Sequence, residues 1–313
     1  MEHDSWSSVS HSSPCPICGK NSWCSVSSDG HTVNCRRESQ DALLSKLDKN
    51  GCEFYIHKTQ EGFNAPIKYA RRPSTQPIPC ADAKTLNRVY SRLLSHLTVS
   101  NDHYEALKNR GLSSSEIRLR EYRTLPFEGR YNLADSLLEE FGEEICCKVP
   151  GIFFRLIRKV KIWSIHGCSG SGLLIPSRGD SGSIEALKIR PDLPTPGMKY
   201  LYLSSKSIGG AGPGARVHVP LFNGDQSNTV RLTEGELKSD IATALSGIHS
   251  ISVPGVQSWR MAIPILQKLG TQKVRLAFDA DASQNITVAK MLSNAATALQ
   301  IEGFTLEVET WNQ

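Results

Sequence analysis

The sequence lacks any apolar run that approaches the length of a membrane-spanning helix, and its first residues lack the basic-then-apolar layout of a secretion signal. These two absences predict a cytoplasmic protein with no membrane partner. A strong excess of one charge is also missing, because 36 Lys and Arg stand against 31 Asp and Glu, which gives a net charge of +5. The overall charge therefore permits nucleic-acid binding without demonstrating it, and evidence for such binding has to come from local clusters of basic residues.

The pattern of a disulfide framework is absent as well. The nine cysteines are an odd number, and four of them crowd between residues 15 and 35. Asp29-Gly30 is a strong two-residue turn signal, and a hairpin centred on it places Cys24 opposite Cys35. Cys15 and Cys18 have the two-residue spacing that bends a backbone around Zn²⁺. We therefore predict a structural zinc site ligated by Cys15, Cys18, Cys24 and Cys35.

Neighbouring side chains leave two questions open. His31 is the weaker alternative for the fourth ligand, because it lies on the Cys35 strand ~13 Å nearer the turn. Arg36 and Arg37, with Trp23 on the opposing strand, either hold a phosphate and stack a base or form a solvated hairpin edge.

Acidic residues follow two short apolar runs in the last third of the chain. Glu234 directly follows the run 229–233, and Asp279 and Asp281 follow the run 273–278. Helix-compatible segments come next in both cases, so both acidic clusters are expected at the carboxyl ends of strands, where open α/β sheets place their chemistry. Three carboxylates there form a candidate site for Mg²⁺ or Mn²⁺. The alternative is that they are caps and solvated loops.

Strands and helices alternate from residue 229 to residue 310, which predicts an α/β fold with a mostly parallel sheet flanked by helices. Helical spacing of apolar residues begins at residue 83, and short strands with glycine turns, among them a hairpin of 173–178 and 184–190, fill residues 150–220. The predicted organisation is a disordered segment 1–13, a zinc ribbon 14–47, a linker 48–82, a helical and basic α+β subdomain 83–222 and an α/β domain 223–313.

The runs Thr233-Glu-Gly-Glu236 and Phe278-Asp-Ala-Asp-Ala282 resemble the Toprim domain shared by bacterial DnaG-type primases, phage primase-helicases, topoisomerases and some nucleases. This resemblance implies that Glu234, Asp279 and Asp281 bind the catalytic metal. The longer run from Glu234 to Asp240, with Val253-Pro-Gly-Val256 and Ser258-Trp259, is most similar to an uncharacterised Toprim-like family of plasmid and phage replication proteins.

Two further segments resemble the DnaG-type primases. The strands and turns of residues 173–206 are similar to the amino-terminal half of the catalytic core, which implies that Arg190, Lys199 and Lys206 hold nucleotide phosphates and template. The cysteine segment is similar to the zinc ribbon that engages single-stranded template. The chain departs from the family in having Lys238 where many primases have Asp, in lacking a second Cys-x-x-Cys, and in ending at Gln313 near the point where a further acidic residue follows in those primases.

The resemblance implies a DNA primase that synthesises primers on single-stranded DNA from nucleoside triphosphates by metal-dependent nucleotidyl transfer. The context would be replication of a plasmid, phage or other mobile element, with a replicative helicase as a candidate partner in trans. Two alternatives stay open: a non-catalytic single-strand-binding replication factor with a vestigial Toprim site, and a Toprim nuclease.

Overall fold

The computed structural model describes residues 6–27, 30–48, 53–59, 78–157, 159–194, 199–224, 228–278 and 286–309. The chain divides into two compact units. The first comprises residues 1–74, 257–260 and 281–295, and the second comprises residues 75–256, 261–280 and 296–313. Within the described ranges, no helix combines the length and the apolar character that crossing a membrane requires.

The first unit contains an antiparallel five-stranded sheet in the order β1-β2-β3-β5-β4. Its strands are β1 (Trp6–Ser8), β2 (Ser25–Ser27), β3 (Thr32–Cys35), β4 (Leu44–Leu47) and β5 (Glu53–Lys58). Val26 faces Val33 across β2 and β3, and both are fully buried in the core of the unit. This register continues to Cys24 opposite Cys35, which confirms the predicted hairpin.

Two predicted boundaries of the first unit were wrong. Residues 6–13 were expected to be disordered, but β1 pairs with β2, and the Val9 amide donates to the Cys24 carbonyl at 3.1 Å. The buried Val9 side chain supplies apolar contact that the polar composition of this segment conceals. Residues 53–58, placed in the linker, form β5 between β3 and β4. Residues 1–5 and 60–77 lie outside the described residues.

The second unit begins with helices around an antiparallel sheet in the order β11-β10-β9-β6. The helices are α1 (Ala83–Ser95), α2 (Asn101–Lys108), α3 (Ser114–Leu119) and α4 (Arg130–Cys146), and the strands are β6 (Arg123–Leu125), β9 (Gly172–Arg178), β10 (Ile184–Pro191) and β11 (Leu201–Tyr202). A separate hairpin pairs β7 (Ile152–Ile157) with β8 (Val160–Ile165), and a short 3₁₀ helix, η1, spans Lys206–Ile208. One face of the four-stranded sheet packs its apolar side chains against α1 and α4.

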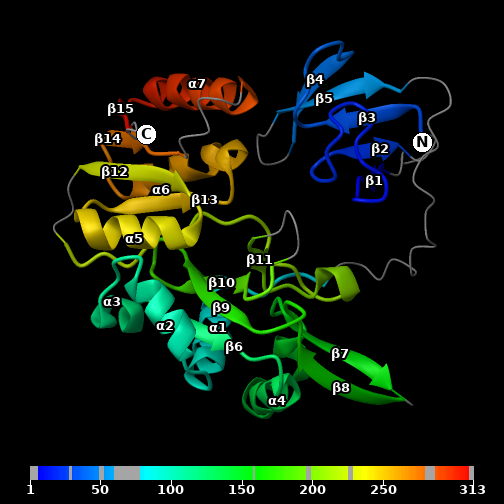
Figure 1. Ribbon diagram of the computed structural model, residues 1–313, viewed down its shortest axis with the longest axis vertical. Helices are drawn as coiled ribbons and strands as arrows, with labels where there is room; N and C mark the ends of the chain where they lie inside the picture. Colours follow the sequence, from blue (N-terminus) through cyan, green and yellow to red (C-terminus); the bar gives the residue numbers. More distant parts are fainter. Residues whose placement is uncertain are drawn as a thin grey trace. The chain divides into compact units, whose positions relative to one another are not determined.

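A parallel sheet in the order β13-β12-β14-β15 completes the second unit (Figure 1). Its strands are β12 (Thr229–Glu234), β13 (Ser250–Val253), β14 (Lys273–Leu276) and β15 (Thr305–Val308), and the helical segments along this stretch are α5 (Glu236–Ser246), η2 (Val256–Met261), α6 (Ala262–Lys268) and α7 (Ile286–Ile301). Alternating strands and helices thus form the predicted α/β fold.

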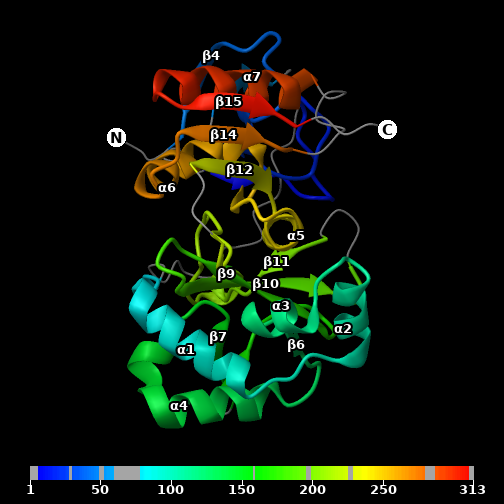
Figure 2. The ribbon, with the colours of Figure 1, turned by 90° about the vertical axis from the view of Figure 1, so that its left-hand side faces the viewer.

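Helix α5 joins the two sheets of the second unit. Figure 2 shows it between β12 and the sheet that contains β9 and β10. Leu237 of α5 is buried in one apolar cluster with Leu173 and Ile175 of β9. Because α5 follows Glu234 directly, the packing of this helix fixes the end of β12 where the acidic residues are expected.

Candidate metal centres and the buried contacts around them

The four predicted zinc ligands come together in the first unit. The Sγ atoms of Cys15, Cys18, Cys24 and Cys35 all lie within 4.8 Å of one another. Cys24 Sγ is 3.8 Å from Cys18 Sγ and 3.9 Å from Cys35 Sγ. Tetrahedral zinc with Zn–S bonds of about 2.3 Å requires sulfur atoms about 3.8 Å apart, so the cluster fits Zn²⁺. His31 is exposed and does not belong to the cluster.

Thiol chemistry supports a bound cation at this position. Hydrogen bonds from Cys24 and Cys35 hold the pKa of the Cys15 thiol far below its ordinary value. The hydrogen bond to Cys15 raises the pKa of Cys24 to about 11, and the bonds to Cys15 and Cys24 raise the pKa of Cys35. One thiolate therefore forms readily, whereas four need a metal to displace the remaining protons. The Glu38 amide also donates to Cys35 Sγ at 3.3 Å.

Arg37 is part of the cysteine cluster. Its Nη1 donates to Cys24 Sγ at 3.7 Å and to the Ser22 carbonyl at 2.7 Å, and its guanidinium lies 5.1 Å from the centre of the Trp23 ring. Four thiolates around Zn²⁺ carry a net charge of −2, which this cation offsets. Binding of nucleic acid by Arg37 stays a prediction, and the contacts give the side chain a structural task as well.

The companion arginine also has a partner within the first unit. Arg36 forms an ion pair with Asp48 at 2.7 Å and lies over the ring of Phe54 at 5.8 Å. A phosphate would have to compete with this carboxylate for the guanidinium. Binding of nucleic acid by Arg36 therefore stays a prediction.

Glu234 lies at the carboxyl end of β12, opposite Val253 of β13, as the sequence predicted. Gly235, with φ of 84°, turns the chain from this strand into α5, a conformation that favours glycine. The chain after β14 runs alongside, because the Ala277 amide donates to the Leu232 carbonyl at 2.9 Å and Thr233 Oγ1 donates to the Ala277 carbonyl at 2.7 Å. Asp279 and Asp281 follow this point but lie outside the described residues, so the three-carboxylate site stays a prediction.

A buried ion pair close to Glu234 was missed by the sequence reasoning. Lys188 Nζ of β10 donates to Glu236 Oε2 of α5 at 2.6 Å, and the Tyr202 hydroxyl donates to Glu236 Oε1 at 3.3 Å. Glu236 is only 3% exposed, and burial raises the pKa of the Tyr202 hydroxyl. The pair anchors the first turn of α5 on β10. In the sequence, the one feature that drew attention to Lys188 is its spacing of two residues from Arg190, which places both on one face of the strand.

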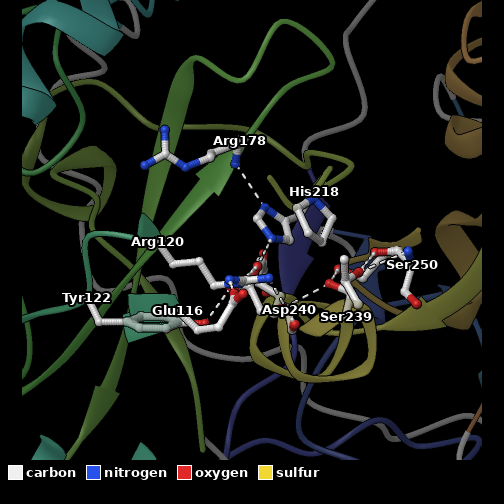
Figure 3. Close-up of polar contacts among 12 residues, drawn as sticks. Glu116, Arg120, Tyr122, Arg178, His218, Ser239, Asp240 and Ser250 are labelled. Carbon is white, nitrogen blue, oxygen red and sulfur yellow. Dashed lines mark hydrogen bonds and ion pairs between the residues drawn. The ribbon is translucent and has the colours of Figure 1, made fainter. Parts of the chain in front are cut away.

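A second buried network surrounds Asp240 in the next turns of α5 (Figure 3). Asp240 is 2% exposed and accepts hydrogen bonds from Arg120 Nε at 3.1 Å and from the Tyr122 hydroxyl at 2.5 Å. His218 Nδ1 accepts the Arg178 amide at 2.9 Å, so its Nε2 carries the proton that is donated to Asp240 Oδ1 at 3.2 Å.

These contacts decide what Asp240 can do. Burial and the negative charge of Asp240 raise the pKa of Tyr122 well above its ordinary value, so the phenol keeps its proton and continues to donate. Arg120 forms a further ion pair with Glu116 of α3. Both carboxylate oxygens of Asp240 are thus engaged in joining α5 to α3 and β6. These contacts give Asp240 a structural role in the second unit.

The predicted phosphate-binding residues are distributed over the second unit. Arg190 of β10 is half-buried and lines a pocket of about 350 Å³ with Asp102, His103 and Arg110. His103 Nε2 lies 2.8 Å from Asp192 Oδ1 at the same pocket. Lys199 and Lys206 are exposed and do not line this pocket. A common phosphate-binding site formed by Arg190, Lys199 and Lys206 stays a prediction.

No protein-family model matches the sequence, and no curated protein sequence is significantly similar to it. Solved structures do match. The zinc-binding and RNA polymerase domains of Aquifex aeolicus primase match with a TM-score of 0.57 and 15% identity over 74% of this chain, which spans 56% of that chain. The E. coli primase catalytic core matches with a TM-score of 0.52 and 17% identity, covering 74% of this chain and 72% of that one. A DnaG primase catalytic domain bound to single-stranded DNA matches with a TM-score of 0.52 and 19% identity, covering 73% and 71%. The chain therefore has the fold of the DnaG-type primase catalytic domain.

Proposed function

We propose that this chain is a primase-like nucleotidyltransferase that synthesises primers on single-stranded DNA from nucleoside triphosphates. The observation that carries the proposal is the position of Glu234, which ends the inner strand β12 of a primase fold next to the chain that leads to Asp279. The proposed setting is the cytoplasm, during replication of a plasmid, phage or other mobile element. A replicative helicase acting in trans is the further partner that we propose.

Each part of the chain has a role in this proposal. Glu234, Asp279 and Asp281 hold Mg²⁺ or Mn²⁺, an ion that neutralises triphosphate charge and lowers the barrier to attack by a 3′-hydroxyl. The cationic side chains bind nucleotide phosphates and template: Arg190, Lys199 and Lys206 in the second unit, and Arg36 and Arg37 beside the zinc cluster. The ion pair of Lys188 with Glu236 holds the turn after Glu234, so the backbone of the acidic site is fixed before substrate binds.

A second candidate is a non-catalytic replication factor that binds single strands. Two observations favour it: Lys238 stands where many primases have Asp, and Asp240 is fully engaged in the buried network. The acidic site of this chain would then have fewer carboxylates than an active primase uses. A Toprim nuclease is the third candidate, since the same constellation of carboxylates can activate water.

We expect Asp279→Asn and Asp281→Asn each to lower template-directed nucleotide incorporation by ~10² or more, comparable to the loss of one electrostatic contact to the transition state. Relief of repulsion among the carboxylates should leave the melting temperature in metal-free buffer unchanged or slightly raised. Incorporation of labelled nucleotides on a single-stranded template, with Mg²⁺ and with Mn²⁺, measures the effect. Binding of the single strand should survive in both variants.

Asp135→Asn is the matched control, because it makes the same substitution at one exposed carboxylate of α4, in the second unit. Its incorporation rate should equal that of the parent. Full activity of both active-site variants would refute the metal assignment. If the parent incorporates no nucleotide on any template, the enzyme proposal is wrong and the non-catalytic candidate takes its place; cleavage of the template instead would indicate the nuclease.

A further inference from the structure

The β7–β8 hairpin has a composition unlike its surroundings. Residues 152–165 read Ile-Phe-Phe-Arg-Leu-Ile-Arg-Lys-Val-Lys-Ile-Trp-Ser-Ile, with cations at four positions and no acidic residue. Within the described part of the chain, β7 and β8 pair only with each other, so both outer edges lack a strand partner. Figure 1 shows the hairpin extending beyond α4. Its outer half is exposed on both faces.

The register separates the two faces of the hairpin. On one face, Lys161 forms an ion pair with Glu143 of α4, and Trp163 packs on Phe154 with ring centroids 5.0 Å apart. This face is attached to the body of the second unit. Side chains alternate along a strand, so the opposite face carries three directly paired couples: Phe153 with the buried Ser164 at its inner end, and Arg155 with Ile162 and Ile157 with Val160 in its outer half. We call the outer two couples, together with the exposed Lys159 of the turn, the free face.

Folding alone does not account for the free face. Ile157 is 54% exposed, Val160 is 59% exposed, and Ile162 on the same face is 36% exposed. Clustered apolar side chains of this kind mark a surface that binds something. Lys and Arg on an unpaired ribbon oppose pairing with a second copy, because two hairpins of this composition repel each other. Cations without any acidic neighbour within the hairpin are instead complementary to a polyanion.

We propose that the free face of the β7–β8 hairpin binds a nucleic-acid duplex. A two-stranded β-ribbon fits the major groove of B-DNA, which is about 12 Å wide. Arg155 and Lys159 contact phosphates on the walls of the groove, while Ile157 and Val160 make apolar contacts with base edges, such as the thymine methyl group that the major groove displays. This inference rests on the nucleic-acid substrate of the proposed function: a primase creates a primer–template duplex, and the hairpin would hold that product.

The charged half of the free face is tested in the full chain with Arg155→Ala/Lys159→Ala. Fluorescence anisotropy measures binding to a blunt 20-base-pair duplex and to one of its single strands between 50 and 200 mM salt. Two lost phosphate contacts should weaken duplex binding ~10-fold and reduce the slope of log affinity against log salt by about 1.8. Single-strand binding should change less. Lys108→Ala/Arg118→Ala removes two exposed cations from α2 and α3, and it should leave the duplex slope unchanged.

The apolar half is tested with Ile157→Ser/Val160→Ser, which keeps every charge. Duplex affinity should fall several-fold at an unchanged salt slope, and the circular-dichroism melt should match the parent because both side chains are exposed. Duplex affinity equal to the parent in both double variants overturns the proposal. A loss of self-association without a loss of duplex affinity also overturns it, and assigns the free face to a second copy.

Failure of this inference can be told apart from failure of the proposed function. Asp279→Asn tests incorporation and should leave duplex affinity unchanged. For single strands, the hairpin variants and the parent should have slopes of log affinity against log salt that differ by less than the contribution of one phosphate contact. If the parent incorporates nucleotides and the hairpin variants bind duplex as the parent does, only the proposal of duplex binding by the hairpin is refuted. Absence of incorporation with hairpin-dependent duplex binding refutes the enzyme proposal alone.

Discussion

Replacing Cys24 with serine is expected to remove zinc from the chain and to unfold the sheet of the first unit. Cys24 is buried at the centre of the cluster, with sulfur atoms 3.8 and 3.9 Å away, and a serine hydroxyl is a poor zinc ligand. Structural zinc contributes on the order of 10 kcal/mol to the folding of small domains, more than the few buried apolar side chains of this unit can supply. Elemental analysis should find about one zinc per parent chain and none in the variant.

Two control variants make this result specific. Cys147→Ser changes the same functional group outside the cluster, where the thiol donates to the Glu144 carbonyl at 3.3 Å, and it should keep the zinc. His31→Ala should also keep it, because His31 does not belong to the cluster. The opposite pattern, with zinc lost from His31→Ala and retained by Cys24→Ser, would show that the four-cysteine assignment is wrong. Near-ultraviolet circular dichroism before and after chelation reports whether unfolding follows the metal.

Local signals predicted the parallel sheet well. Helix α5 spans Glu236–Ser246, in the helix-compatible segment expected after Glu234, and glycines with positive φ bound it at Gly235 and Gly247. The strands preceding Glu234 and Asp279 were found because buried parallel strands are short apolar runs. The hairpin register was predicted from a single turn, since Asp29-Gly30 fixes every pairing up to Cys24 and Cys35.

Pairings between distant segments could not be predicted in the same way. Strand β5 joins β3 through the register Cys35 with Tyr55, and no turn signal connects those two segments. Strand β1 pairs with β2, whose residues lie seventeen or more positions later in the chain. No turn signal connects these two segments either, so their pairing could not be predicted. The edge strand β1 is recognised only when its partner is known, because its sequence resembles that of a polar loop.

Buried charges were the main omission at the candidate site. Lys188 and Glu236 lie 48 residues apart, and Arg120 and Asp240 lie 120 apart. Lysine, arginine and acidic residues are ordinarily exposed, so composition favours the surface for each of them taken alone. Ser113 caps α3 by accepting from the Glu116 amide at 3.2 Å, whereas the Glu116 carboxylate binds Arg120. The acidic residues Asp279 and Asp281 stay predictions.

The buried network around Asp240 leads to the second large expected effect. Asp240→Asn should destabilise the second unit by about 3–5 kcal/mol, because an amide cannot accept on both sides and the Arg120 charge loses a buried partner. The remaining ion pair of Arg120 with Glu116 favours the lower end of that range. For a unit of this size, about 3 kcal/mol corresponds to a fall in melting temperature of roughly 6–12 °C, measured by circular dichroism.

Tyr122→Phe is the graded control for Asp240→Asn. It removes one hydrogen bond to a carboxylate, worth about 1.5–3 kcal/mol, and leaves the ion pair of Asp240 with Arg120 in place, so its melting temperature should fall between those of the parent and Asp240→Asn. Both variants should retain template-directed incorporation below their melting temperatures, since Asp240 holds α5 in place and is not among the proposed metal ligands. Asp240→Asn that melts with the parent yet loses incorporation would show instead that this carboxylate turns toward the acidic site and acts as a ligand there.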